Sequence, residues 1–136
     1  MDSQRKKPSL DHWHWLRTRV RCALPFSHGE DLIFARLNVE TEAMVHCGQL
    51  DAWFAHEANF RLLHETALDL ALPFAWRQQC LSRACRPIDV LEQLARDAAH
   101  RQRVSALSRR LAMTQLEQSL PLYSRHEARH HRQWRP

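Results

Sequence analysis

The residues with the most recognisable chemistry lie near the C-terminus, where His126, Glu127 and His130 match the pattern H-E-x-x-H. On a helix this spacing places two imidazoles one turn apart to bind zinc, and the glutamate acts as a general base. Such a site needs a third ligand, and only residues 131–136 follow. The surrounding sequence is polar and lacks an apolar shell to hold ligands in place. We therefore keep a metal-dependent hydrolase as a remote alternative and expect no catalytic residue, bound metal or cofactor.

The four cysteines do not show the spacing of a redox or zinc site. Cys80 and Cys85 are the closest pair, five positions apart, which differs from the C-x-x-C motif of such sites. The N-terminus is basic but lacks the apolar segment of a secretory signal. The longest apolar run, residues 70–76, is too short to span a bilayer. We therefore expect a cytoplasmic protein with reduced thiols and no membrane helix.

Arginine is the dominant charged residue. Lys6 and Lys7 are the only lysines among the 20 basic residues, so 18 are arginines, a bias that indicates a GC-rich, bacterial gene. Residues 1–30 carry six basic and three acidic groups, residues 31–72 carry two and seven, and residues 73–136 carry twelve and five.

The basic C-terminal half either shows ordinary solvated faces or binds a polyanion, for which arginine is well suited. The candidate polyanion-binding residues are Arg101, Arg103, Arg109, Arg110, Arg125, Arg129 and Arg132.

Composition and periodicity predict an all-α fold. Only 2 of the 136 residues are glycine, which disfavours sheets and excludes glycine-rich phosphate loops. No pattern in the sequence indicates a small-molecule substrate. Apolar residues recur at helical spacing along most of the chain. The pattern predicts a compact bundle of about five helices, near residues 10–22, 27–48, 51–72, 73–81 and 88–120. We expect a helical domain over residues 10–120, after a basic N-terminal extension (1–9) and before a basic Arg/His-rich tail (121–136).

The last of these predicted helices has apolar residues on two opposite sides. At about 100° per residue, Val104, Leu107 and Leu111 lie opposite the apolar residues that follow Ile88. One straight helix cannot bury both sides against one core. Either the helix breaks near residues 100–103 into a hairpin, or it continues and its second side meets a partner. A helix sandwiched within its own domain is the third alternative.

The tryptophans of the first predicted helix also point to an interface. Trp13 and Trp15 lie about 200° apart on a helix, so they cannot both face one core, and we place Trp15 at the surface. The predicted partner-binding residues are Val104, Leu107, Leu111 and Trp15.

The expected function is that of a non-catalytic, cytoplasmic protein–protein interaction module. It would act as an adaptor, a chaperone-like protein or a regulatory subunit, with self-association as one form. The alternative is a helical subunit that binds the nucleic-acid backbone without base readout, through the C-terminal arginines.

Overall fold

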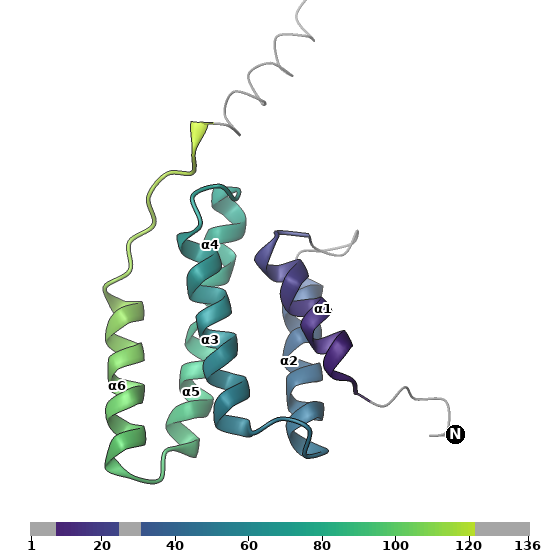
Figure 1. The fold of residues 1–136 in the computed structure, drawn as a ribbon. Helices are drawn as coiled ribbons and strands as arrows, with labels where there is room; N and C mark the ends of the chain where they lie inside the picture. Colours follow the sequence, from purple (N-terminus) through teal and green to yellow (C-terminus); the bar gives the residue numbers. More distant parts are fainter. Residues whose placement is uncertain (1–7, 25–30, 122–136) are drawn as a thin grey trace, which may run out of the picture.

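The computed structural model describes residues 8–24 and 31–121, and within these ranges the chain forms six α-helices and no strand (Figure 1). The helices are α1 (Leu10–Arg21), α2 (Asp31–His46), α3 (Ala52–Leu68), α4 (Phe74–Arg83), α5 (Cys85–Leu94) and α6 (Ala98–Ala112). The predicted all-α fold is confirmed. In the part of the chain that the structure describes, no helix combines the length and the apolar character needed to cross a membrane.

Side-chain caps explain where three of the helices begin. Ser9, Asp51 and Asp97 precede α1, α3 and α6, and each side chain accepts a hydrogen bond from the backbone N–H three residues later, at 3.1, 3.0 and 2.8 Å. α2 ends two residues before Gly48, whose φ of 80° is the left-handed conformation that glycine adopts without strain. The predicted capping pair of Ser27 and Glu30 lies outside the described residues.

The third helix is shorter than the sequence pattern predicts. It ends at Leu68 rather than near residue 72. The cause is local, because the Asp69 carboxylate accepts a hydrogen bond from the backbone N–H of Ala71 at 3.0 Å and stabilises a turn before Pro73.

The predicted helix over residues 88–120 is two helices in the structure. The chain reverses at residues 95–97, and α6 runs antiparallel to α5 (Figure 1). The hairpin alternative is therefore confirmed, although the break lies just before residues 100–103. α6 also ends at Ala112, and residues 113–120 continue without helical structure.

α3 lies at the centre of the molecule and contacts α1, α2, α4 and α5 (Figure 1). α6 lies on the outside and packs mainly on α5. The core combines apolar residues from all six helices, among them Trp13, Leu16, Val20, Ile33, Phe34, Leu37, Phe60, Leu63, Trp76, Leu91 and Leu107. Burial of this surface is the main stabilising contribution to the fold.

A buried polar cluster connects α1, α2 and α3. The hydroxyl oxygen of Thr41 accepts hydrogen bonds from the Trp13 indole N–H and the Asn59 amide, each at 2.9 Å, and donates to the Leu37 carbonyl at 2.7 Å. One donor and two acceptor positions are thereby all used. Arg17 donates in turn to the amide oxygen of Asn59. The cluster fixes the relative positions of three helices, because buried polar groups are costly when unpaired.

A second buried polar group, Arg77 of α4, holds the segment 113–120 against the bundle. Its guanidinium is inaccessible to solvent and donates to the backbone carbonyls of Ala67 and Glu117, at 2.8 and 2.7 Å. Ser119 adds a hydrogen bond to the Leu72 carbonyl at 2.6 Å. The segment is therefore joined to α4 and to the end of α3.

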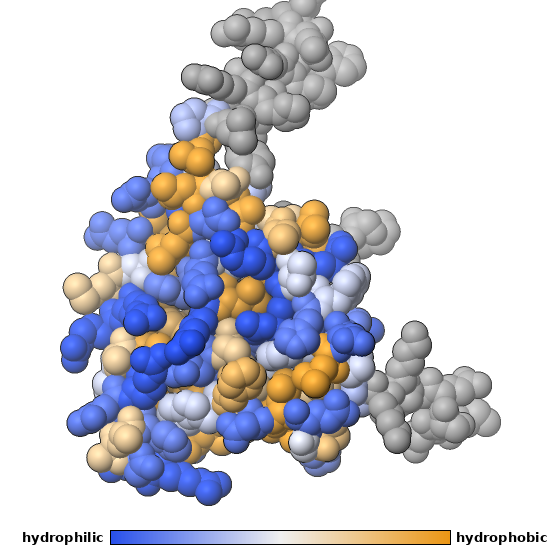
Figure 2. Space-filling model, viewed as in Figure 1, coloured by the Kyte–Doolittle hydropathy of each residue, from blue (hydrophilic) through white to orange (hydrophobic). Residues whose placement is uncertain are grey.

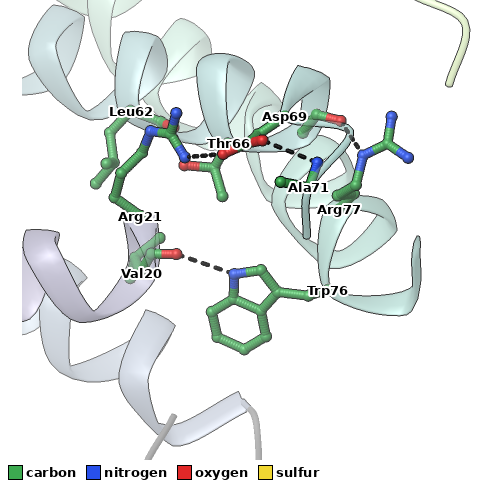
Figure 3. A network of polar contacts seen from close by, with 9 residues as sticks. Val20, Arg21, Leu62, Thr66, Asp69, Ala71, Trp76 and Arg77 are labelled. Carbon is green, nitrogen blue, oxygen red and sulfur yellow. Dashed lines mark hydrogen bonds and ion pairs between the residues drawn. The ribbon is translucent and has the colours of Figure 1, made fainter. Parts of the chain in front are cut away.

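Figure 3 shows how the α3–α4 corner is tied to α1 as well. The Trp76 indole N–H donates to the Val20 carbonyl at 2.9 Å, and Arg21 pairs with Asp69 at 2.6 Å. The end of α1 is thus fixed by one buried hydrogen bond and one partly exposed ion pair. The buried bond is the stronger constraint, since exposed ion pairs contribute little to stability.

Replacing Thr41 tests the buried polar cluster. Thr41→Val keeps the shape but leaves the Trp13 indole and the Asn59 amide without their acceptor, and we expect the free energy of unfolding to fall by about 2–4 kcal/mol. Urea denaturation followed by tryptophan fluorescence measures the change. The matched control is Thr18→Val, since exposed Thr18 makes the same type of bond to the His14 carbonyl. The control should change stability by less than about 0.5 kcal/mol, and equal losses in both variants would contradict a central role for Thr41.

Candidate functional site

One side of α6 belongs to the core of the domain. The side chains of Val104 and Leu107 are 7% and 0% exposed, and Leu111 is partly buried against the same cluster. The prediction that this side meets a partner is therefore wrong for Val104 and Leu107. The physical reason is the reversal at residues 95–97, which turns their side of α6 inward instead of leaving it at the surface.

The opposite side of α6 faces solvent. Ala98, Arg101, Gln102, Ser105, Ala106 and Arg109 line a shallow depression there of about 460 Å³. These positions repeat at intervals of three and four residues, so they form one continuous stripe along the helix. In Figure 2 hydrophilic side chains cover this side of the molecule, with paler apolar ones between them. We call these six residues the outer face of α6.

The charge of α6 is entirely positive, because residues 98–112 contain four arginines and no carboxylate. Arg103 is neutralised by Glu57 of α3, with Nε 2.6 Å from the carboxylate oxygen. The ion pairs between described residues do not include Arg101, Arg109 or Arg110. Three of the predicted polyanion-binding residues are thus exposed cations on one helix. Arg103 instead forms an ion pair that links α6 to α3.

The other predicted polyanion-binding residues belong to the C-terminal residues 122–136. Arg125, Arg129 and Arg132 lie outside the described residues, as do His126, Glu127 and His130. Neither the predicted basic tail nor the H-E-x-x-H pattern is therefore described by the structure.

Trp15 lies at the surface as predicted, whereas Trp13 is buried. The exposed fractions are 45% and 2%. The Trp15 ring stacks on His12 at 5.5 Å, and the Arg19 guanidinium lies over it at 4.9 Å. This aromatic surface of α1 lies on a different helix from the outer face of α6.

The histidines and cysteines of the described ranges form no group of three potential metal ligands. Cys80 is buried, and burial raises the pKa of its thiol to about 12, so it remains protonated. Burial also lowers the pKa of His56, against a weaker opposing effect of Glu42, whose carboxylate lies 3.1 Å away. The pKa of His64 is lowered by burial and then by the charge of Arg110. These groups are buried parts of the packing rather than a reactive cluster.

Two features of α6 were missed in the sequence. One is the role of Glu57, which neutralises Arg103 from 46 positions away and which no local spacing reveals. The other is the outer face itself, which spacing could have revealed. Gln102, Ser105 and Arg109 stand opposite Leu107 on a helical projection, and a stripe of small and cationic residues opposite a buried leucine indicates an exposed face.

Comparison with known proteins adds no assignment, since no protein-family model matches the chain and searches of curated proteins and of solved structures found no match.

The placement of Leu107 in the core can be tested by truncation. Leu107→Ala should lower the free energy of unfolding by about 2–5 kcal/mol, because it removes a fully buried side chain and leaves a cavity. Met113→Ala is the matched control at the end of α6, where the side chain is 76% exposed, and should change stability by less than about 0.5 kcal/mol. Urea denaturation measures both. An unchanged free energy of unfolding in Leu107→Ala would contradict the assignment of Leu107 to the core and would indicate that this side of α6 is exposed.

The buried histidines predict a pH dependence of stability. Because the pKa of His64 is lowered in the folded state, the unfolded chain binds more protons. The His64 contribution to stability is therefore complete above the ordinary value of about 6.5 and is lost as the pH falls below it. His64→Gln, which can still bond Thr114, should reduce the loss of stability between about pH 7 and pH 5. Denaturation curves across this range measure the slopes, and equal slopes in both proteins would refute the prediction.

Asp69 contributes to a change of stability at lower pH than His64 does. The hydrogen bond from Arg21 lowers the pKa of Asp69 below its ordinary value of about 3.9. The stabilisation from this pair is present above that value and is lost only as the pH falls through the lowered pKa. The two contributions can therefore be separated by the pH at which stability changes.

Proposed function

We propose that this protein is a non-catalytic interaction module, whose outer face of α6 binds an acidic helix of a partner protein. The observation that carries the proposal is the exposed pair Arg101 and Arg109, set among small side chains on a helix without carboxylates. An adaptor or regulatory subunit needs a surface of this kind.

The spacing of the two arginines specifies the geometry of the partner. They are eight positions apart, and at 1.5 Å per residue this corresponds to about 12 Å along the helix. Ala98, Ser105 and Ala106 lie beside them and have short side chains. Short side chains allow a second helix to approach closely, so that the side-chain ridges of one helix can pack into the grooves of the other. The complementary helix would carry carboxylates about two turns apart, with small residues between them.

The charges favour an acidic protein over nucleic acid. Backbone binding to DNA draws its affinity from many phosphate contacts. The depression on α6 contains only Arg101 and Arg109 as cations, and Arg103 is already paired with Glu57. Two cations among alanine and serine side chains suit helix packing better than a run of phosphates.

The proposal places the protein in a reducing cytoplasm. All four cysteines, Cys22, Cys47, Cys80 and Cys85, are free thiols, and three of them are exposed. Exposed unpaired thiols fit a compartment that keeps cysteines reduced.

A pair of synthetic helical peptides tests the proposed function. The probe peptide carries two glutamates eight residues apart on an alanine-rich face, and the control peptide has the same composition with the glutamates on opposite faces. We expect the first peptide to shift the backbone amide signals of the outer face of α6 in the ¹⁵N-labelled protein. Binding should weaken with added salt, because exposed charges are screened.

Two double variants with equal changes of net charge complete the test. Arg101→Gln with Arg109→Gln should weaken peptide binding roughly tenfold, since two exposed ion pairs contribute up to about 1 kcal/mol each. Arg36→Gln with Arg61→Gln removes two exposed arginines from α2 and α3 and should change the affinity less than about twofold. Equal effects of the two double variants would contradict the proposal. Tighter binding of random duplex DNA than of the peptide, lost in the α6 variant, would replace it by the nucleic-acid alternative.

A further inference from the structure

A cleft of about 330 Å³ opens between α2 and the corner where α4 meets α5, with α3 as its floor. α2 packs on α1 and α3 and has few contacts with the α4–α5 corner. Phe34 of α2 contacts α4, with its ring 5.0 Å from the Trp76 ring. Side chains from α2, α3, α4 and α5 line this space, and its volume lies in the range of sites that bind small molecules.

The lining is apolar in its depth and polar at its mouth. Phe34, Leu37 and Leu63 are buried core residues whose side chains reach the cleft. Asn38, Ser82 and Arg86 lie at its edge and are half-buried or exposed. An apolar surface beside a few polar groups is the usual composition of a small-ligand site.

The charge of the lining is positive, because it includes Arg83 and Arg86 and no carboxylate. The Arg83 guanidinium lies over the Phe34 ring at 4.7 Å and forms part of the wall. Arg86 is exposed and takes no part in the ion pairs between described residues. A guanidinium at the mouth of an apolar cleft is suited to carboxylate or phosphate groups, which it can contact by two parallel hydrogen bonds.

We propose that this cleft binds a small organic anion, with its carboxylate or phosphate group at Arg86 and its apolar part against Phe34, Leu37 and Leu63. Ser82 and Asn38 supply further hydrogen-bonding groups beside the anion. This site is separate from the outer face of α6, so it does not depend on the proposed interaction with an acidic helix.

His56 provides a reporter of the charge at Arg86. Its pKa is lowered first by burial and also by the positive charge of Arg86, while Glu42 acts in the opposite direction. An anion bound to Arg86 would offset that positive charge. Binding should therefore raise the pKa of His56, an effect that contact with the apolar floor alone would not produce.

The experiment uses three related probes with the full-length protein. 4-Phenylbutyrate and phenyl phosphate carry the anion and an apolar ring, and 4-phenylbutyramide is the neutral counterpart. We expect at least one anion to bind with a dissociation constant of about a millimolar or tighter by NMR titration. The amide should bind roughly tenfold more weakly, since it lacks the charge-assisted hydrogen bonds. Comparison of the two anions shows which headgroup the site takes.

Three variants make the outcome decisive. Arg86→Gln should weaken anion binding roughly tenfold and abolish the response of His56. Arg96→Gln, at another exposed position after α5 and outside the lining, should leave both unchanged. Asn38→Phe should weaken binding of all three probes by filling the mouth. The proposal is overturned if neither anion binds, if the amide binds as tightly as the anions, or if Arg86→Gln binds as the wild type does.

Discussion

The reversal of the chain at residues 95–97 is the constraint that determines which side of α6 is buried and which side faces solvent. Ala95 takes an extended conformation, and Asp97 caps the new helix through the backbone N–H of His100. The reversal lays α6 along the bundle, where the His100 ring stacks on Trp53 at 4.0 Å and Arg103 reaches Glu57. The same reversal buries the Leu107 side chain and leaves Arg101 and Arg109 exposed to solvent. One turn thus determines both a part of the core and the proposed interaction surface.

Buried polar groups fix the relative positions of the helices more narrowly than apolar packing alone does. Thr41 joins α1, α2 and α3, and Arg77 joins the segment after α6 to the α3–α4 corner. Apolar packing is tolerant of small shifts, whereas a buried donor without an acceptor costs free energy at once. The cleft lies beside α2, which Thr41 ties to α1 and α3 and which has few contacts with the α4–α5 corner.

The sequence was sufficient to predict the fold class and the apolar face of single helices. It was not sufficient to predict which helices pack against each other. The scarcity of glycine and the helical spacing predicted an all-α chain, and the opposite apolar sides around Ile88 and Leu107 signalled a hairpin among their alternatives. The position of the break was missed, because Asp97 reads equally well as an exposed helix residue or as a cap. The surface position of Trp15 followed from its angle to Trp13. The burial of Leu107 could not follow in the same way, since it depends on which surface α6 meets after the turn.

Amide hydrogen exchange of α6 in the free protein, resolved by residue, tests the central claim most directly. If α6 is part of the core, the amides of Val104 and Leu107 should exchange through the same cooperative opening as the buried middle of α3, with comparable protection. Their protection should also fall together with that of α3 as urea is added. Rapid exchange along the whole of α6, at the rate of a fraying helix while α3 stays protected, would show that α6 is detached. Its apolar side would then be free for a partner, and the assignment of Val104 and Leu107 to the core would be contradicted.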